Sequence, residues 1–563
     1  MKIVIVGGVA GGATAAARIR RLNEEAQIVV FERSGYISYA NCGLPYFIGD
    51  VIDDPQALTL QTPESFFTRF RVDMRVRHEV TAIHRDRKTV SVTDLATGET
   101  FEESYDKLLL APGAKPTQPK LPGVGLDQVF TLRTVEDTFR IKDYINAHKP
   151  KSAVLAGGGF ISVELAENLR ALGMAVTIVQ RPKQLMNPFD PDMAAFLHAE
   201  ARKHGVDLAL GFSVEGFAEQ DGGVDVLLEK APALHADMVV LAIGVTPEST
   251  LAKEAGLDLG IKGSILVNDR METSDPDIYA VGDAVQVRHT VTGQPAHIAL
   301  AGPANKQGRI AADNICGGDS RYLGSQGSSI LQLFDLTAAA TGLNEESIRR
   351  AGLDYDKVIL SPMNHAGYYP GGSLLTMKVL FEKETYRLLG AQIVGYQGVD
   401  KHIDILATAI HARLKATDLK DLDLAYAPPY SSAKAPVNMA GFMIDNIARG
   451  KLKQWYLEDV EALPRDGSVT LLDTRTPMEY AGGYIPGFRN IPVDDLRARL
   501  DEIEPGKPVY LICQSGLRSY IASRILEEKG FETYNFTGGF RYYAAVAYDQ
   551  ALIREAYACG MDR

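Results

Sequence analysis

Hydrophobic positions along the chain gather in short runs that are followed by glycine turns and helix-forming stretches. Residues 2–22 begin with an apolar run, continue through a cluster of glycines and end in an alanine-rich stretch, and a second apolar run fills 27–32. Residues 152–180 repeat the same order. This pattern predicts a strand, a tight turn, a helix and a second strand, which is the unit of a dinucleotide-binding fold. Two copies predict two dinucleotide sites.

The glycines of the two predicted turns are incomplete in different ways. In the first copy Gly7 and Gly12 are the outer glycines and Val9 holds the middle position. In the second copy Gly157 and Gly159 are present, and a serine stands in the place of the last glycine. Such glycines let the backbone approach a pyrophosphate, whose charge is met by amides at the helix N-terminus.

Polar residues at the predicted strand ends are candidates for hydrogen bonds to the hydroxyl groups of the ligands. Glu32 ends the second strand of the first copy and can accept hydrogen bonds from ribose hydroxyls. The matching position of the second copy offers Gln180, which is followed by Arg181. Further along, 277–285 place Asp283 at a strand end, where its carboxylate could bind a ribityl hydroxyl.

Length and composition narrow the class of protein. A chain of 563 residues is too long for one core, so roughly three or four domains are expected. A net charge of −12 argues against nucleic acid as a partner. The first strand starts at Lys2, which leaves no room for a signal peptide, and the apolar runs are too short to span a membrane. No cysteine pair has the spacing of a zinc site or a disulfide framework, so we expect a cytoplasmic protein with reduced thiols and no metal; the cysteines are Cys42, Cys316, Cys513 and Cys559.

Cys42 is an isolated thiol in the segment "ISYANCGLPY", which follows the strand that ends in Glu32. Because this segment holds no second cysteine, a disulfide between local partners is excluded. An isolated thiol beside a redox cofactor has two uses: oxidation to sulfenic acid by a peroxide, or a mixed disulfide with an external thiol. The residues of the segment leave both open.

The order of these elements resembles the FAD-dependent pyridine nucleotide-disulfide oxidoreductases. In that family the first site holds FAD, the second holds NAD(P)H, and the segment with "VGD" returns to the FAD domain. The resemblance implies an α/β fold with two Rossmann-like dinucleotide-binding domains and an α+β dimerisation domain. The implied limits are an FAD-binding domain in two parts (1–115 and 245–325), an NAD(P)H-binding domain (116–244) and a dimerisation domain (326–450).

The C-terminal part has a different character. A polar stretch predicts a linker at 451–459, and 460–563 resemble a single α/β rhodanese domain. The resemblance rests on the opening Asp473, Arg475 and Glu479, on the "IPG" and "NIP" turns, and on the loop "CQSGLRS".

The "CQSGLRS" loop brings its own chemistry to the rhodanese resemblance. Successive N–H groups of such a loop would surround the sulfur of Cys513 and stabilise a persulfide anion, to which Arg518 adds positive charge. Tyr484 stands where the family often has histidine.

The segment around Cys42 is similar to that of the coenzyme A disulfide reductases, and with the rhodanese tail the whole chain resembles their fused class, described as coenzyme A persulfide or polysulfide reductases. The resemblance implies a homodimer that uses FAD and NAD(P)H to reduce coenzyme A persulfide, polysulfides or coenzyme A disulfide. It implies that Tyr368 and Tyr426 reach the redox cysteine of the partner subunit, and it favours NADH. The implied catalytic residues are Cys42, Cys513, Tyr368, Tyr426 and Arg518.

The same resemblance assigns the binding residues. For the dinucleotides these are Gly7, Val9, Ala10, Gly11, Gly12, Glu32, Arg33, Asn41, Val80, Gly113, Asp283, Gly157, Gly159, Phe160, Ile161, Glu164, Gln180 and Gly244. For coenzyme A they are Thr14, Arg18, Arg21, Ser38, Asn41, Arg69, Arg71, Asn305, Tyr426 and Lys434. A family lysine falls on Phe70, where Arg69 and Arg71 could supply the charge. His365, Cys316 and Cys559 have no motif and are expected to be structural.

Two other functions remain from the sequence. One is an NADH peroxidase or oxidase that works through a Cys42 sulfenic acid, and the coenzyme A contacts count against it. The other is a sulfur carrier or sensor without catalysis, and the complete Cys513 loop counts against it.

Overall fold

The computed structural model describes residues 1–558, so Cys559 lies outside the described residues. The chain forms two compact units. The first contains residues 1–183 and 205–327, and the second contains 184–204 and the chain from Ser328 onward. Each unit is built around its own sheets.

The first sheet of the first unit is parallel and carries the first predicted turn. Its strands lie in the order β20-β9-β1-β2-β5, with bounds β1 (Lys2–Val6), β2 (Gln27–Glu32), β5 (Asp73–Val76), β9 (Lys107–Leu110) and β20 (Ile278–Ala280). Ile3 and Ile5 of β1 enter one hydrophobic cluster, and Val4 and Val6 enter another. Because both faces of a parallel sheet are covered, its strands are apolar throughout, which is the pattern seen in the sequence.

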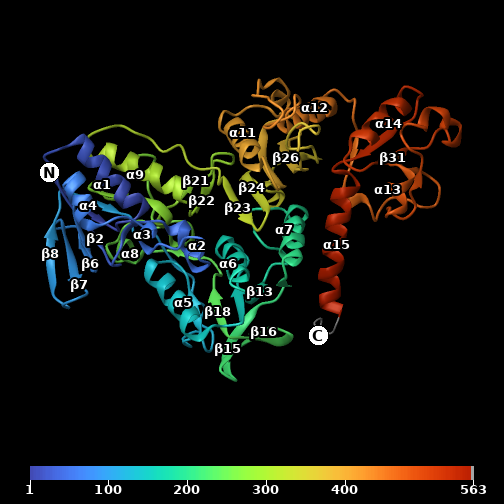
Figure 1. The fold of residues 1–563 in the computed structure, drawn as a ribbon. Coiled ribbons are helices and arrows are strands. Elements are labelled where there is room, and N and C mark those ends of the chain that lie inside the picture. Colours follow the sequence, from blue (N-terminus) through green and yellow to red (C-terminus); the bar gives the residue numbers. More distant parts are fainter. Residues whose placement is uncertain (559–563) are drawn as a thin grey trace. The chain divides into compact units, whose positions relative to one another are not determined.

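Different elements cover the two faces of this sheet. The alanines of α1 (Ala10–Leu22) pack on one face, and α1 lies beside α9 (Ala301–Ile315) (Figure 1). A Cβ on Gly308 of α9 would lie 2.4 Å from the carbonyl oxygen of Gly11, so the two helices touch through their backbones. The other face is covered by an antiparallel sheet of β6 (His78–His84), β7 (Thr89–Asp94) and β8 (Thr100–Ser104).

The second parallel sheet of the first unit carries the second predicted turn. Its order is β11-β18-β12-β13-β14, with bounds β11 (Val129–Thr131), β12 (Ser152–Ala156), β13 (Ala175–Gln180), β14 (Val206–Leu210) and β18 (Met238–Leu241). Smaller pairings complete the unit: β3 (Ile37–Tyr39) with β4 (Thr59–Gln61), β10 (Ala114–Pro116) with β19 (Val245–Pro247), β21 (Val287–Arg288) with β22 (Pro295–Ala296), and the sheet of β15 (Val214–Gln220), β16 (Gly223–Leu228) and β17 (Ala231–Ala236). Its remaining helices are α2 (Leu44–Ile48), α3 (Pro55–Leu58), α4 (Pro63–Phe70), α5 (Val135–His148), α6 (Phe160–Ala171) and α8 (Thr250–Glu254).

The second unit holds an antiparallel sheet and a parallel one. The antiparallel order is β23-β24-β27-β26-β25, with bounds β23 (Ser329–Leu333), β24 (Leu336–Gly342), β25 (Tyr355–Leu360), β26 (Thr376–Glu382) and β27 (Leu388–Gly395). The parallel order is β28-β32-β31-β29-β30, with bounds β28 (Gln454–Trp455), β29 (Thr470–Asp473), β30 (Arg489–Asn490), β31 (Val509–Ile512) and β32 (Thr533–Phe536). Its helices are α7 (Pro191–Lys203), α10 (Glu345–Arg350), α11 (Val399–His411), α12 (Pro436–Ala448), α13 (Pro477–Ala481), α14 (Leu517–Glu527) and α15 (Gly539–Ala558). The predicted α/β class with two Rossmann-like parallel sheets, followed by an antiparallel sheet with helices and a C-terminal α/β part, is confirmed.

Two segments differ from the domain limits expected from the sequence. Residues 451–459, predicted as a linker, contribute β28 to the parallel sheet of the second unit. Trp455 in this strand is only 2% exposed and donates its indole N–H to the carbonyl oxygen of Leu511 (3.0 Å). The burial of this one large side chain explains why an otherwise polar stretch packs against the sheet. The helix α7, inside the range 116–244 assigned to nucleotide binding, belongs to the second unit.

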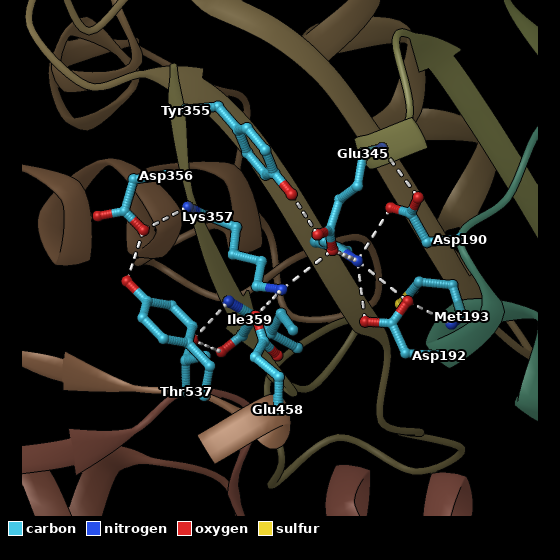
Figure 2. A network of polar contacts seen from close by, with 12 residues as sticks. Asp190, Asp192, Met193, Glu345, Tyr355, Asp356, Lys357, Ile359, Glu458 and Thr537 are labelled. Atoms are coloured by element: carbon cyan, nitrogen blue, oxygen red, sulfur yellow. Dashed lines mark hydrogen bonds and ion pairs between the residues drawn. The ribbon is translucent and has the colours of Figure 1, made fainter. Parts of the chain in front are cut away.

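A buried ion-pair network joins α7 to the two sheets of the second unit. Lys378 of β26 is fully buried, and its ammonium binds Asp190 (2.9 Å), Asp192 (2.8 Å) and Glu345. Figure 2 shows these three carboxylates converging on one point. Burial opposes the charged form, but the three carboxylates outweigh it and raise the pKa of Lys378. Tyr542 of α15 donates to Asp192, which ties the C-terminal helix into the network.

Further polar contacts join the two sheets directly. Lys357 of β25 binds Glu345 (3.0 Å) and Glu458 (2.9 Å). The backbone N–H of Ile359 in the same strand donates to Thr537 Oγ1 (2.8 Å), at the end of β32 (Figure 2). Ile359 also packs in the hydrophobic cluster that contains Trp455. The parallel sheet is therefore held against the antiparallel sheet by both apolar and ionic contacts.

Candidate active sites

The first glycine turn leaves no room for side chains. Gly7 has φ +99°, and a Cβ there would lie 2.1 Å from the carbonyl oxygen of Ala111. A Cβ on Gly12 would lie 1.9 Å from the carbonyl oxygen of Gly7. Helix α1 begins at Ala10, directly after Val9, so its first N–H groups lie next to the turn. This is the cradle that a dinucleotide pyrophosphate requires.

The carboxylate of Glu32 is fixed at the edge of this turn. It is 8% exposed and accepts the backbone N–H groups of Gly8 (2.8 Å) and Ser34 (2.8 Å). Burial raises its pKa, which the two N–H donors oppose. Each oxygen keeps a further lone pair, so the side chain can still accept from a ribose hydroxyl.

The second turn repeats the geometry of the first. Gly157 has φ +119°, and a Cβ there would lie 2.2 Å from the carbonyl oxygen of Ala242. Helix α6 begins at Phe160, and Gly244 has φ +119° as well. Gln180 ends β13 and is half-buried. The backbone at both turns therefore leaves room for the pyrophosphate of a dinucleotide.

Cys42 lies in a short 3-10 turn, Asn41–Gly43, and its thiol is exposed on the first unit. Arg133 donates to Asp283 (2.9 Å). The side-chain amide of Asn41 donates to the backbone oxygen of Arg133 (3.1 Å) and accepts from its guanidinium (3.3 Å). Asn41, Arg133 and Asp283 thus form one chain of polar contacts beside the thiol.

The surroundings of Cys42 favour the protonated form of its thiol over the thiolate. Reduced solvation and the carboxylate of Glu164 raise the pKa of Cys42, and the Arg133 guanidinium opposes them. Burial and the neighbouring Glu167 raise the pKa of Glu164 to about 7. Tyr46 hydrogen-bonds to Glu164, and burial raises the pKa of Tyr46 to about 12. A ligand that brings positive charge or hydrogen-bond donors to the sulfur would therefore activate it.

The sequence alone does not indicate that Arg133 and Tyr46 belong to the surroundings of Cys42. Arg133 follows β11, far along the chain from Cys42, and no spacing rule links the two positions. Tyr46 lies within the quoted segment, but its contact is with Glu164 of α6, which only the tertiary fold brings close.

The structure brings some of the coenzyme A candidates together. Thr14 of α1 donates to Asn305 of α9 (2.6 Å), so these two side chains share one site. Arg18 is paired with Asp313 of α9 (2.7 Å). Ser38 has φ +44°, a left-handed conformation that is uncommon outside glycine. The three remaining arginines of the set are exposed at the ends of α1 and α4: Arg21, Arg69 and Arg71.

The other candidates of the first unit have varied surroundings. Val80 is 5% exposed and packs in the core, so only its backbone could meet a ligand. Arg33 lies 4.0 Å from Glu79. Gly113 has φ +72°, and a Cβ there would lie 3.4 Å from the guanidinium of Arg133.

The two tyrosines of the second unit meet each other. The hydroxyls of Tyr368 and Tyr426 are 2.8 Å apart, and both side chains are exposed (76% and 45%). Their hydrogen bond raises the pKa of Tyr426. Lys434 is also exposed. His365 is buried, and its Nδ1 lies 3.0 Å from the backbone oxygen of Ala366, consistent with a structural side chain.

A cavity of about 620 Å³ opens beside Tyr426 on the second unit. Its lining combines aromatic and polar side chains, which are Asn364, Gln397, Asp400, Lys401, Tyr426 and Tyr430.

The thiol of Cys513 is buried under its own loop. Its Sγ accepts the backbone N–H of Gly516 (3.1 Å) and the hydroxyl of Ser519 (3.2 Å). Gly516 has φ +97°, and helix α14 begins at Leu517 directly after it. Two donors and a helix N-terminus therefore point at the sulfur, which favours an anion there.

Charged side chains around the loop are paired with one another. Arg518 donates both terminal nitrogens to Glu479 (2.7 Å each). Arg475 is 1% exposed, binds Asp473 (2.7 Å) and stacks over the ring of Phe540 at 3.7 Å. The sequence does not indicate the pairing of Arg518 with Glu479, although both residues belong to motifs of the rhodanese resemblance.

Within the described residues, no helix combines the length and the apolar character that crossing a membrane requires. The three described cysteines, Cys42, Cys316 and Cys513, are all free thiols.

Comparison with known proteins gives three family matches. The family model "Pyridine nucleotide-disulphide oxidoreductase" matches residues 1–308, its dimerisation domain matches 329–436, and the rhodanese-like domain matches 456–545.

Individual relatives cover between 78% and 97% of the chain. The crystal structure of reduced CoADR-RHD from Bacillus anthracis is 48% identical with a TM-score of 0.94, covering 97% of this chain and 98% of that one. A NAD-dependent persulfide reductase from A. fulgidus is 36% identical with a TM-score of 0.91, covering 96% and 100%. A coenzyme A disulfide reductase from Staphylococcus aureus (strain bovine RF122 / ET3-1) is 37% identical over 442 residues, which are 78% of this chain and 99% of that relative. This chain is therefore an enzyme of the FAD-dependent pyridine nucleotide-disulphide oxidoreductase family that acts on sulfur groups, and it belongs to the class in which a coenzyme A disulfide reductase is fused to a rhodanese domain.

Proposed function

We propose that the protein uses NAD(P)H and FAD to reduce coenzyme A persulfide, polysulfides and coenzyme A disulfide through Cys42. The observation that carries this proposal is a free, exposed thiol in the first unit, in a segment without a second cysteine. Such a thiol forms its disulfide with an external partner. The names of the relatives, a coenzyme A disulfide reductase and a persulfide reductase, support sulfur compounds as that partner.

The proposed chemistry of Cys42 is thiol–disulfide exchange. Its thiolate attacks coenzyme A disulfide, a mixed disulfide with coenzyme A forms, and one coenzyme A thiolate leaves. With coenzyme A persulfide, attack on the inner sulfur gives the same mixed disulfide and releases hydrosulfide. Two electrons and one proton then restore the Cys42 thiolate and free coenzyme A. NAD(P)H and FAD, when bound, supply the two electrons.

Residues of this chain would manage the proton and the negative charge. In the proposed homodimer, Tyr368 and Tyr426 of one subunit lie near Cys42 of the other. Their linked hydroxyls, 2.8 Å apart, suit donation of a proton to a departing thiolate. The Arg133 guanidinium favours the thiolate form of Cys42. The dimerisation domain matched at 329–436 supports the homodimer.

Coenzyme A would lie along α1 and α9 of the first unit. The hydrogen-bonded Thr14 and Asn305 offer polar contacts there. A polyphosphate needs several cations, and exposed arginines at the ends of α1 and α4 meet that need, namely Arg21, Arg69 and Arg71. Arg18 would first have to leave Asp313.

The rhodanese domain would carry sulfur. Cys513 would exchange sulfane sulfur with the thiol of coenzyme A, and the donors from Gly516 and Ser519 would stabilise the persulfide anion. We further propose NADH as the preferred electron source. The end of β13 offers Gln180 instead of a carboxylate, so this preference is modest.

Steady-state turnover on a panel of substrates tests the proposal. NADH oxidation is measured with coenzyme A persulfide, polysulfide, coenzyme A disulfide and hydrogen peroxide, together with sulfide release. We expect turnover on the three sulfur compounds and sulfide from the first two. Turnover confined to hydrogen peroxide would replace the proposal with a peroxidase that works through a Cys42 sulfenic acid.

The variant Cys513→Ser separates the two thiols. It is expected to spare reduction of small disulfides, which meet Cys42 directly, and to impair sulfur transfer from donors that need the rhodanese loop. Loss of disulfide reduction in this variant would contradict the proposal that Cys42 reduces small disulfides without Cys513. Unchanged turnover on every donor would contradict a sulfur-carrying role.

A further inference from the structure

Two arginines at the Cys513 loop are neutralised by carboxylates. Arg518 follows the loop directly, but both of its terminal nitrogens bind Glu479. Arg475 is buried and paired with Asp473. Arg541 also contacts the loop through its backbone N–H, which donates to the carbonyl oxygen of Gln514, but its guanidinium donates to the neutral hydroxyl of Thr376 in the antiparallel sheet (2.8 Å) and so keeps its charge.

Glu479 remains ionised in the pH range in which the enzyme would work. The hydrogen bonds from Arg518 lower the pKa of Glu479 to about 2, and Glu479 in turn raises the pKa of Arg518. The charge of Cys513 also raises the pKa of Arg518, so the thiolate and the guanidinium interact electrostatically. The carboxylate of Glu479 thus cancels the charge of Arg518, the guanidinium that interacts with the sulfur.

Exposed apolar side chains flank this neutral ion pair. Leu517 is 65% exposed and follows Gly516, whose N–H donates to Sγ. Met478 is 86% exposed and precedes Glu479 on α13. Exposed side chains of this size at a site suit an uncharged alkyl chain better than a small hydrated anion.

We propose that Glu479 determines the donor specificity of the Cys513 loop: by cancelling the charge of Arg518, it disfavours anionic donors such as thiosulfate and leaves the loop open to alkyl persulfides. This inference rests on the proposed role of Cys513 as a sulfur carrier. To that role it adds alkyl persulfides as the class of donor and Glu479 as the residue that selects them.

The two donors place different demands on the loop. The Cys513 thiolate attacks the outer sulfur of an alkyl persulfide R–S–SH. A bond forms between the Cys513 sulfur and that outer sulfur, which gives Cys513–S–SH, and the S–S bond of the donor breaks to release the thiolate R–S⁻. With thiosulfate the same attack forms Cys513–S–S⁻ and expels sulfite, which carries two negative charges. A trianionic encounter of thiolate and thiosulfate needs a free cation, whereas the neutral S–SH group needs only the donors of Gly516 and Ser519.

The variant Glu479→Gln tests this inference because it removes the charge and keeps the geometry. Glu479 is the third residue of α13, where it accepts from the backbone N–H of Thr476 (2.9 Å) in a capping box. Glutamine fills this position equally well, so α13 should form as before. Glutamine can also accept a hydrogen bond from Arg518, which stays near the loop with its charge exposed.

The assay measures sulfur transfer to cyanide as thiocyanate, with thiosulfate and with N-acetylcysteamine persulfide as donors. The quantity compared is the ratio of kcat/KM for thiosulfate to kcat/KM for the persulfide. In Glu479→Gln this ratio should rise at least about tenfold, which corresponds to about 1.4 kcal/mol, mainly through a lower KM for thiosulfate. The double variant with Arg518→Gln should bring the ratio back to the wild-type value.

Glu502→Gln is the matched control. Glu502 pairs with Arg499 in the same domain, so the variant removes an equal charge without changing an ion pair at the loop. Its ratio should stay at the wild-type value.

Other results would overturn the inference. An unchanged ratio in a folded Glu479→Gln protein would do so, and so would a wild-type protein that uses thiosulfate as well as the persulfide. If mass spectrometry finds no persulfide on Cys513 with either donor in any variant, the proposed sulfur-carrying role fails, and the inference falls with it.

Discussion

Replacing Lys378 by methionine would leave the carboxylates of the buried network in the second unit with one cation fewer. Methionine has a similar length and no charge, so the substitution removes the ammonium and little volume. Lys357 would still bind Glu345 at 3.0 Å. The carboxylates left without a cation would be Asp190 and Asp192, whose side chains are 3% and 11% exposed.

The structure sets the size of the effect. Removing one partner of a buried ion pair costs about 3–5 kcal/mol, because the remaining charge is buried and uncompensated. Hydrogen bonds to the carboxylates soften this cost, such as the one from Gln392 to Asp190 (2.7 Å). We therefore expect a loss near the lower limit, about 3 kcal/mol in the free energy of unfolding of the second unit.

The sign of the pH dependence follows from the same geometry. Burial and repulsion from Asp192 and Glu345 raise the pKa of Asp190, and without Lys378 the main opposing charge is gone, so this pKa lies above that of the unfolded chain. The ionised form of Asp190 then destabilises the fold at high pH, and protonation removes this penalty as the pH falls. The variant should be closer to wild type at pH 5 than at pH 8.

The sequence supplies a local probe for the measurement. Trp455 is the single tryptophan of the chain, is 2% exposed and shares a hydrophobic cluster with Ala195 of α7 and Ile359 of β25. Its fluorescence during urea unfolding reports on this part of the molecule. With a slope of about 1.5 kcal/mol per M, a loss of 3 kcal/mol lowers the midpoint by about 2 M.

Lys383→Met is the control. Lys383 is 54% exposed and pairs with Asp354 (3.1 Å) on the surface, where an ion pair contributes about 0–1 kcal/mol. A midpoint in Lys378→Met within the error of wild type would refute the reasoning. An equal shift in both variants would refute it as well, because the effect would then not depend on burial.

Three further outcomes test the first unit and the tyrosine pair. Glu164→Gln removes a negative charge near Cys42, so the pH profile of alkylation of Cys42, followed by mass spectrometry, should move to lower pH; a shift to higher pH would contradict the assigned sign. Gln180→Glu should raise the ratio of kcat/KM for NADH to that for NADPH, and a fall in this ratio would contradict a position of Gln180 beside the adenosine ribose of the cofactor. Tyr426→Phe breaks the hydrogen bond to Tyr368 and should lower kcat for coenzyme A disulfide at least about tenfold, whereas an unchanged kcat would rule out a role in proton transfer.

The fold was largely predictable because its signals are local. The turns at Gly7 and Gly157 require glycine at positions where a Cβ would meet the backbone, and the apolar strands beside them are continuous in the sequence. The place of α7 in the second unit was not predictable. It depends on contacts of Asp190 and Asp192 with Lys378, which is almost two hundred residues away in the chain.

The candidate sites show the same division. Cys42 and Cys513 could be selected because their segments resemble family motifs. Arg133 could not, since its link to Asn41 and Asp283 forms only when the first unit folds. The pairing of Arg518 with Glu479 also joins two motifs that are separate in the sequence, and only the structure shows that one charge cancels the other.

The variant Cys42→Ser tests the central claim most directly. A serine hydroxyl has a pKa far too high to form the mixed disulfide, and nothing in the two glycine turns depends on the thiol. NADH oxidation with coenzyme A disulfide and coenzyme A persulfide is compared between wild type and a variant shown to retain FAD. We expect the variant to bind FAD as the wild type does and to lose turnover on both substrates. Retained turnover in the FAD-loaded variant would contradict the central claim.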